Sequence, residues 1–181
     1  MNKKIYAIVG LSGSGKSTVA SELSKLLGIP KITTVTTRPM RPFESNGKDY
    51  YFFSKERFDI LIEENYLIAR EDFKVANSDI WSYAIRKKDL DSCEKCVIVV
   101  TPQGVMDLKA LGYNVISFYI DVNEEERLYR IYGRKDNQGD AEIQRRNRDD
   151  KEKFKDFIPD YILNNNNDID ETIKQFLHCF I

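Results

Sequence analysis

A glycine-rich segment near the start of the chain contains residue types suited to binding phosphate. It consists of Gly10, Leu11, Ser12, Gly13, Ser14, Gly15, Lys16, Ser17 and Thr18. The pattern G-x-x-x-x-G-K-[ST] is typical of a loop whose glycines let backbone N–H groups point inward at phosphate oxygens. We therefore assign all of these residues to binding a nucleoside triphosphate. The Lys16 ammonium would bridge its β- and γ-phosphates and take part in catalysis, and the Ser17 hydroxyl would bind Mg²⁺.

The segments on either side of this loop predict a strand and a helix that hold it in place. Residues 5–9 are apolar and partly β-branched, as in a buried strand. Residues 16–27 place apolar side chains at helical spacing, among them Val19 and Leu23. A helix that begins at the loop would add a positive potential of about half a charge where the phosphates bind.

Two arginine-bearing segments predict further contacts with phosphate groups. The first reads T-T-R-P-M-R-P-F-E over residues 36–44 and G-K-D-Y-Y-F over residues 47–52. Two arginines on a proline-stiffened loop, with a tyrosine nearby, can form a fork around a second phosphate. The second segment, residues 127–148, has six arginines on two expected helices joined by a polar loop. Such a loop can place positive charge on a transferring phosphoryl group, although its acidic neighbours also allow a salt-bridged surface helix.

The composition is that of an ordinary folded protein of 181 residues, with 41% hydrophobic and 31% charged residues. The formal net charge of −1 argues against bulk electrostatic attraction to nucleic acid or to an anionic membrane. No apolar run approaches the roughly 20 residues that span a bilayer, so we expect a cytoplasmic protein with neither nucleic-acid nor membrane partners. The C-x-x-C at Cys93 and Cys96 lacks further zinc ligands, and we interpret both residues as ordinary thiols.

Strand-like and helix-like segments alternate along much of the chain, which predicts an α/β fold with a parallel sheet covered on both faces. We expect strands at residues 5–9, 32–37, 49–53, 66–68, 80–85, 96–100, 115–120 and 161–163, and helices at residues 16–27, 55–65, 87–95, 102–111, 124–132, 141–157 and from 168 or 170 to 180. Ser54, Asn123 and either Asp168 or Asp170 are suited to cap helices. The aromatic and arginine-rich stretch of residues 32–85 interrupts the alternation and predicts an insertion.

These motifs resemble those of the guanylate kinase family over nearly the whole chain. In order, the chain has G-x-S-G-S-G-K-S-T, T-T-R-P-x-R-P-x-E-x-x-G-K-D-Y-Y-F, Q-G, R-x-x-x-R and E-I-x-x-R. The T-T-R-P-x-R-P segment is the most specific part, because phosphate loops occur in many unrelated proteins. The resemblance implies a P-loop NTPase three-layer α/β sandwich with a parallel sheet, formed as a single domain over residues 1–181. Its parts would be a core (residues 1–31, 96–132 and 158–181), a nucleoside-monophosphate-binding insertion (residues 32–95) and an arginine lid (residues 133–157).

The resemblance also implies ATP-dependent phosphorylation of a nucleoside monophosphate, GMP or dGMP, with Mg²⁺ as cofactor. Arg38, Arg41 and Tyr50 look like ligands of the acceptor phosphate. Glu44 looks like the acidic residue that orients the two arginines, and Tyr83 looks like a further contact to the same phosphate.

Three more positions match residues with roles in this family. Thr34 falls where the family has a serine that contacts guanine. Arg134 and Arg146 look like the catalytic lid arginines that contact the transferring phosphoryl group. Asn164 falls near the family's asparagine beside the ATP base. Because the attacking phosphate oxygen is already an anion, no general base is required.

The residues that would read guanine depart from the family pattern. Ala69 stands where a guanine-binding glutamate is usual, and Glu71 or Asp72 could take that role after a small shift; we assign Glu71. Thr101 replaces the second aspartate of D-x-D-x-Q-G, and Ile85 replaces the hydroxyl residue of Y-G-[TS]. A lost base-edge partner costs about 1–3 kcal/mol, which is enough to relax a base preference.

Three other functions fit parts of this pattern. A monophosphate kinase with another or relaxed base preference would explain the changed guanine contacts, and a phosphosugar kinase on the same fold would need none of them. A non-catalytic peptide-binding module of the same fold is disfavoured by the intact phosphate loop. For the leading hypothesis the partners are ATP and a nucleoside monophosphate, with the chain acting as a monomer or homodimer.

Overall fold

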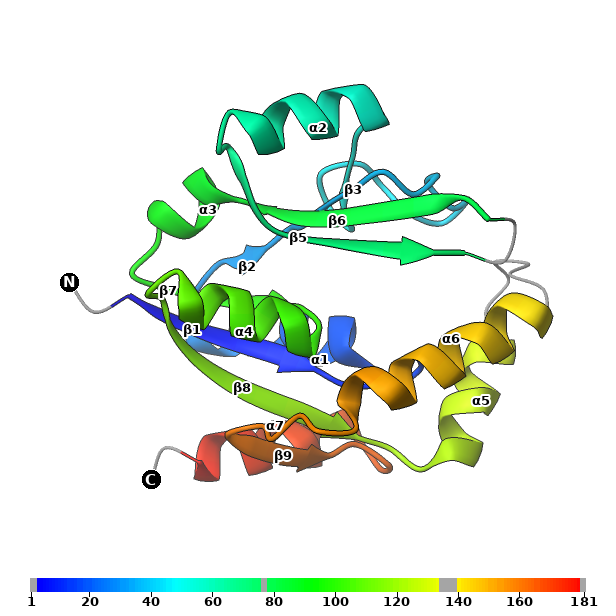
Figure 1. Cartoon of the computed structure of the whole chain (residues 1–181). Coiled ribbons are helices and arrows are strands. Elements are labelled where there is room, and N and C mark those ends of the chain that lie inside the picture. Colours follow the sequence, from blue (N-terminus) through cyan, green and yellow to red (C-terminus); the bar gives the residue numbers. More distant parts are fainter. Residues whose placement is uncertain (1–2, 76–77, 134–139, 180–181) are drawn as a thin grey trace.

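A computed structural model describes residues 3–75, 78–133 and 140–179, and within them a five-stranded parallel sheet forms the centre of the molecule (Figure 1). Its strands are β1 (Lys4–Val9), β2 (Lys31–Ile32), β7 (Lys95–Val99), β8 (Asn114–Asp121) and β9 (Tyr161–Asn164). They are arranged in the order β2-β7-β1-β8-β9. Ala7, Ile8 and Val9 of the middle strand are fully buried, as expected of a parallel strand covered on both faces.

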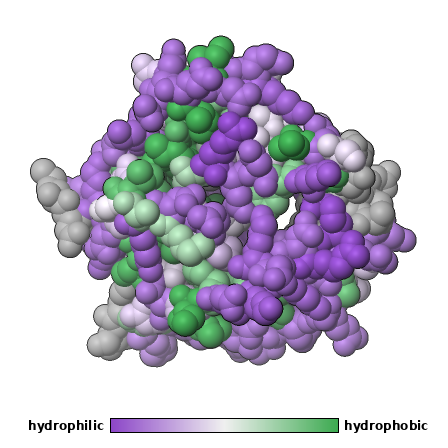
Figure 2. All heavy atoms as spheres, in the orientation of Figure 1, coloured by the Kyte–Doolittle hydropathy of each residue, from purple (hydrophilic) through white to green (hydrophobic). Residues whose placement is uncertain are grey.

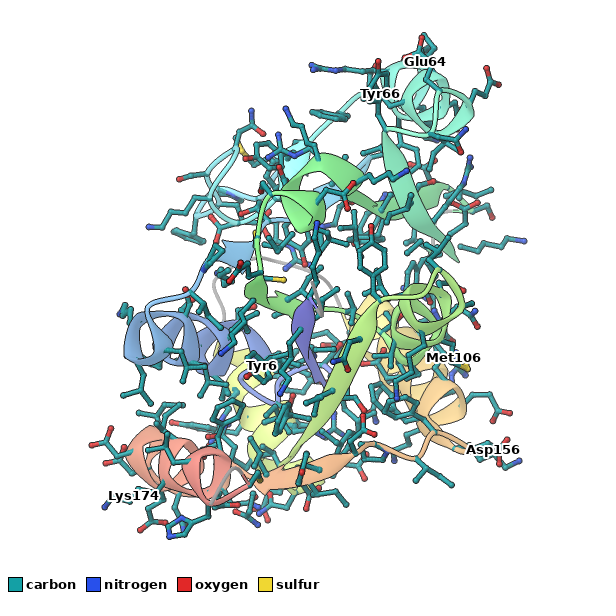
Figure 3. All side chains as sticks on the ribbon, turned by 90° about the vertical axis from the view of Figure 1, so that its left-hand side faces the viewer. Tyr6, Glu64, Tyr66, Met106, Asp156 and Lys174 are labelled. Atoms are coloured by element: carbon teal, nitrogen blue, oxygen red, sulfur yellow. The ribbon has the colours of Figure 1, made fainter. Side chains whose placement is uncertain are left out.

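Helices cover both faces of this sheet and complete three layers (Figure 1). One face carries α1 (Lys16–Leu27) and α7 (Ile169–His178), and the other carries α4 (Pro102–Ala110). Tyr6 extends from β1 into the core on the first face, where its ring centroid lies 6.3 Å from that of Phe118 and 5.7 Å from that of Phe176 (Figure 3). The predicted α/β fold class is confirmed.

A second, smaller sheet lies above the central one in the view of Figure 1. Its strands are β3 (Val35–Thr36), β4 (Tyr51–Phe52), β5 (Leu67–Lys74) and β6 (Ile80–Arg86), arranged in the order β4-β3-β6-β5. Helix α2 (Lys55–Glu63) covers its outer face and buries Phe58 against Val35, Leu67 and Ala84. This sheet therefore has a small hydrophobic core of its own.

The prediction of one strand over residues 32–37 was wrong. Ile32 pairs with β7 in the central sheet, whereas Val35 and Thr36 pair with β4 and β6 in the second sheet. The chain crosses from one sheet to the other between these pairs, and Thr34 lies at the crossing. The predicted strand at residues 66–68 extends to Lys74, because antiparallel pairing with β6 continues along it.

The remaining helices are α3 (Lys87–Asp91), α5 (Glu124–Tyr132) and α6 (Asp140–Phe154). The predicted N-caps are confirmed for Ser54, Asn123 and Asp168, each of whose side chains accepts a backbone N–H of the first helical turn. Helices α3 and α6 end earlier than predicted. After α3, the Ser92 hydroxyl donates to the Asp89 carbonyl. At the end of α6, the N–H groups of Lys155 and Phe157 bond to carbonyls three residues earlier, and Pro159, which cannot continue a helix, follows.

Both cysteines of the C-x-x-C are free thiols. Burial raises the pKa of the Cys96 thiol to about 12, so it stays protonated at neutral pH. In the part of the chain that the structure describes, no group of three or more histidine, cysteine, aspartate or glutamate side chains is arranged to hold a metal ion. None of the described helices combines the length and apolar character needed to cross a membrane.

Candidate active site

A cavity of about 510 Å³ lies between the glycine-rich loop, the second sheet and α6. This volume is in the usual range for small-molecule sites, about 300–1,000 Å³. Figure 2 shows a hollow in this face of the molecule, with hydrophilic residues around much of its rim. Of the predicted site residues, the lining includes Gly10, Ser12, Gly13, Gly15, Lys16, Ser17, Thr18, Thr34, Arg38, Arg41, Glu44, Tyr50, Glu71 and Tyr83. The structure thus brings the predicted donor and acceptor groups together at one site.

The phosphate loop, residues 10–17, runs from the end of β1 to the start of α1. Gly13 has a φ of 84°, and a Cβ there would lie 2.5 Å from the carbonyl oxygen of Arg127, so only glycine fits. Lys16 Nζ donates to the carbonyl oxygens of Gly10 at 2.7 Å and Leu11 at 2.9 Å. Leu11 itself is half-buried and Ser14 fully buried, outside the cavity lining.

Two arginines of α5 support this loop, Arg127 from the interior of the protein and Arg130 from a partly exposed position. Arg127 is only 1% exposed and donates to the Ser12 carbonyl at 2.9 Å and to Asn147 Oδ1 at 3.0 Å. Arg130 donates to the Asn165 carbonyl at 3.1 Å. The sequence suggested that the arginines of this region place charge on a phosphoryl group, but these two fix the backbone around the loop.

Asn164, predicted to lie beside the ATP base, is on β9, and its Oδ1 accepts the N–H of Asn166 at 3.1 Å. Its neighbour Asn165 is 5% exposed and donates through Nδ2 to the Ser14 carbonyl at 2.8 Å. Sequence reasoning missed Asn165 within a run of asparagines. Side chains two residues apart along an extended segment point the same way. An apolar Leu163 that is buried therefore indicates that Asn165, two residues later, also points inward. The role of Asn164 stays a prediction.

The predicted acceptor-phosphate residues form a connected group at the second sheet. Arg38, which is 4% exposed, donates to both carboxylate oxygens of Glu44, at 2.8 and 2.6 Å. The Arg41 N–H donates to the same carboxylate at 2.8 Å. Burial raises the pKa of the Glu44 carboxyl, but its bonds with Arg38 and Arg41 outweigh this and hold the pKa below its usual value. The rings of Tyr50 and Tyr83 meet edge to face beside this group, with centroids 5.9 Å apart.

A β-bulge in β5 decides which carboxylate faces the cavity. Ile68 pairs with Ile85 and Glu71 pairs with Tyr83, so β5 has one residue more than β6 between the two pairs. Ala69 adopts a φ of 53° at this point. The extra residue changes which side chains face the cavity beyond it, and Glu71 is among the lining residues. The bulge supplies the small shift that the sequence assignment of Glu71 required.

The Glu71 carboxylate has two partners from distant parts of the chain. The Thr101 hydroxyl donates to Oε2, and Lys153 Nζ donates to Oε1 at 2.5 Å. The alternative candidate, Asp72, is exposed and accepts from Arg70 Nε at 3.1 Å. Glu71, and not Asp72, is therefore the acidic residue of this strand that lines the cavity.

The two predicted lid arginines cannot be placed. Arg134 lies outside the described residues, and Arg146 belongs to α6 with a side chain that is likewise outside them, so both assignments stay predictions. Helix α6 does bring other residues to the cavity, namely Arg145, Asp149, Asp150, Lys153 and Phe154. Asp150 Oδ2 accepts the N–H of Ser12 at 2.7 Å, so α6 contacts the phosphate loop directly.

Comparison with known proteins gives a consistent result. The family model described as "Guanylate kinase" matches residues 2–180. The guanylate kinase of Wolbachia pipientis wMel is 32% identical over 172 residues, which cover 91% of this chain and 82% of that protein. The guanylate kinase of Mycoplasmoides gallisepticum is 28% identical over 144 residues, covering 78% of this chain and 73% of the relative.

Two further matches extend over almost the whole chain. "Guanylate kinase 2, chloroplastic/mitochondrial" of Oryza sativa subsp. japonica is 30% identical over 182 residues, covering 94% of this chain and 61% of the longer relative. The crystal structure of guanylate kinase from Anaplasma phagocytophilum superposes with a TM-score of 0.64 at 26% identity, covering 98% of this chain and 84% of that one. Likeness in sequence and likeness in fold therefore point to the same family.

Proposed function

The chain belongs to the guanylate kinase family, and from this premise we propose that it transfers the γ-phosphoryl group of ATP to GMP or dGMP, giving ADP and GDP or dGDP. The observation that supports the proposal is that two groups suited to binding phosphate line one cavity. The phosphate loop provides one group, and Arg38, Arg41 and Tyr50 provide the other. An enzyme that only hydrolysed a triphosphate would need the first alone.

On the donor side, the residues present suit a triphosphate with Mg²⁺. Backbone N–H groups of the loop and the N-terminus of α1 would hold the phosphates, and the Lys16 ammonium would neutralise the charge shared by the β- and γ-groups. The Ser17 hydroxyl would be the protein ligand of Mg²⁺, an ion that commonly keeps water and phosphate oxygens as its other ligands. Bound Mg²⁺ supplies further charge neutralisation in phosphoryl transfer.

On the acceptor side, the buried pair of Arg38 and Glu44 has the rigidity that positioning requires. A guanidinium held on two hydrogen bonds loses little freedom when it also binds a phosphate. Arg41, Tyr50 and Tyr83 would complete the site, so that an acceptor oxygen faces the γ-phosphorus. Catalysis would then consist of orientation and charge stabilisation, with Arg134 and Arg146 contributing charge to the transferring group.

We also propose the division into a core (residues 1–31, 96–132 and 158–181), a monophosphate-binding insertion (residues 32–95) and a lid (residues 133–157). The separate hydrophobic cluster around Phe58 supports an insertion that is packed as a unit. The contact of α6 with both the phosphate loop and Glu71 supports a lid function for that helix.

A second candidate function is the same reaction with another or relaxed base preference. The observation in its favour is the base end of the cavity, where Ala69 and Thr101 stand in place of two carboxylates expected for guanine. There Glu71 is already paired with Lys153. The two candidate functions therefore differ in the base of the acceptor, which a comparison of nucleoside monophosphates measures directly.

A coupled assay of ADP release across the common ribo- and deoxynucleoside monophosphates tests both candidates. We expect GMP and dGMP to give the highest kcat/KM, with Mg²⁺ required. A different base in first place would support the second candidate. Turnover of none of them would contradict both, and a panel of sugar phosphates would then test the remaining kinase hypothesis.

A further inference from the structure

A lysine from α6 lies beside Glu71 at the base end of the cavity. Lys153 Nζ is 2.5 Å from Glu71 Oε1 and 3.4 Å from the centroid of the Phe73 ring. All three side chains line the cavity, and the pair is shielded, with 31% of the Lys153 side chain and 15% of the Glu71 side chain exposed. Contacts to a carboxylate and to an aromatic face hold the ammonium more firmly than a solvent-exposed pair would.

The hydrogen-bonding capacity of this cluster is not exhausted. Each carboxylate oxygen can accept two hydrogen bonds, and one on each oxygen of Glu71 is taken, by Lys153 and by Thr101. The ammonium has three protons, of which Glu71 takes one. The cluster can therefore offer a strong donor and a two-oxygen acceptor next to each other.

We propose that Lys153 is a specificity-determining residue that donates a hydrogen bond to the 6-oxo group of a purine acceptor. In the same complex Glu71 accepts from N1–H and the 2-amino group. The inference rests on the proposed function. Guanine presents an acceptor followed by two donors along this edge, which is the complement of an ammonium beside a carboxylate.

The same arrangement rejects adenine. Tyr83 lies opposite Glu71 in the β5–β6 ladder, so the cluster adjoins the acceptor-phosphate group, and a bound phosphate would fix the register of the base. In that register the 6-amino group of adenine would face the ammonium, and its unprotonated N1 would face the carboxylate. Two donors would meet at one position and two acceptors at the other, and neither pair can bond.

Lys153 also makes base reading depend on the position of α6. Asp150, three residues earlier, lies on the same helix face and contacts the Ser12 N–H of the phosphate loop. Helix α6 thus reaches the donor loop and the base end at once.

The test compares Lys153→Met with the wild-type enzyme on two acceptors. One is GMP, and the other is 6-thioguanosine 5′-monophosphate, which keeps N1–H and the 2-amino group and replaces the 6-oxo oxygen by sulfur, a weak hydrogen-bond acceptor. We expect kcat/KM for GMP to fall roughly 10- to 100-fold, the effect of losing a hydrogen bond from a charged donor. We expect kcat/KM for the analogue to change by less than about 3-fold and the KM for ATP to stay constant.

Two further variants complete the design. Lys153→Arg keeps a charged donor and should recover most of the GMP activity. Lys151→Met is the matched control, because Lys151 is on the same helix and pairs at 2.9 Å with Glu124 instead; it should behave as wild type on both acceptors. Thermal melting of each variant checks that the fold is retained.

Equal losses on both acceptors would overturn the inference, since they would show that Lys153 only holds α6 in place. A lower KM for GMP in Lys153→Met would overturn it too, because the lysine would then compete with the base for Glu71. If the wild-type enzyme phosphorylates GMP and Lys153→Met has the same kcat/KM for GMP, the inference about Lys153 is overturned and the proposed function stands. A wild-type enzyme that phosphorylates no monophosphate contradicts the proposed function as well.

Discussion

The phosphate loop and the base end of the cavity are built on different principles. The loop presents backbone groups of consecutive residues to the cavity, with a geometry set by glycines such as Gly13. The base end is assembled from three side chains far apart in the sequence: Glu71 on β5, Thr101 at the start of α4 and Lys153 on α6. A substitution in the phosphate loop therefore disturbs the local fold, whereas the base end can change one side chain at a time without disturbing the backbone.

This difference explains where the chain follows the family pattern and where it departs from it. A backbone site needs its glycines, because a Cβ at Gly13 would collide with the Arg127 carbonyl. A side-chain site can compensate for the loss of a carboxylate. Here a bulge in β5 brings Glu71 to the cavity, and α6 contributes Lys153 beside it. We therefore expect changes in the loop to abolish the reaction, and changes at the base end to change which acceptor is used.

The largest expected effect is that of Lys16→Ala. Loss of this ammonium should lower kcat by roughly 1,000-fold or more with every acceptor, since it removes a charge that stabilises the transferring phosphoryl group. Lys25→Ala is the control on the same helix, because Lys25 is exposed and pairs with neighbouring Glu22; it should stay within about 2-fold of wild type. Turnover by Lys16→Ala near the wild-type rate would contradict the assigned role.

A pair of glycine variants tests whether the loop is limited by space. Gly13 and Gly112 have similar φ angles, 84° and 85°, but a Cβ at Gly112 would meet nothing within 4 Å. Gly112→Ala should cost about 1–2 kcal/mol of stability from backbone strain alone. Gly13→Ala should cost about 2–5 kcal/mol, because overpacking is added to the strain. Urea denaturation measures both, and equal costs would refute the steric argument.

The pH dependence of stability tests the buried pair of Arg38 and Glu44. Because the folded-state pKa of Glu44 is below its usual value of 4.5, the pair stabilises the fold above that pH, and the contribution is lost as the pH falls through the folded pKa. Glu44→Gln should cost about 1–3 kcal/mol at pH 7, and the gap to wild type should narrow in acid. A gap that does not change with pH would contradict an ionised Glu44.

The smallest expected effect is at Thr101, whose hydroxyl serves both Glu71 and the N-terminus of α4. Thr101→Val should raise the acceptor KM about 3-fold and lower stability by about 1 kcal/mol, since the Gly104 N–H loses its cap. Thr101→Ser keeps the hydroxyl and should resemble wild type in both measurements. A larger effect on the KM for ATP than on the acceptor KM would move Thr101 away from the base end.

Local patterns were enough to predict the elements that carry the loop. Helix α1 begins and ends where the sequence predicts, and α5 follows its cap at Asn123 over the predicted residues. The predicted acceptor residues Arg38, Arg41 and Tyr50 line the cavity as expected. In each case neighbouring residues determine the conformation, so a linear pattern contains the necessary information.

The features that escaped prediction depend on pairing between distant segments. The division of residues 32–37 between two sheets, and the bulge at Ala69, are set by which strand each segment pairs with. Lys153 and Glu71 are 82 residues apart, and only the packing of α6 over the cavity brings them together. The periodicity of apolar residues and the presence of capping residues contain no information about contacts between distant segments.

The support that Asn165 gives to the phosphate loop has a consequence for synthesis of the protein. The Ser14 carbonyl and its partner Asn165 are 151 residues apart, and Thr172 of α7 holds Asn165 in turn. The ribosome therefore synthesises the phosphate loop early, whereas the residues that hold its backbone in place are synthesised late. Nucleotide binding, which stabilises only the finished arrangement, would then protect whole molecules and leave truncated ones to proteolysis.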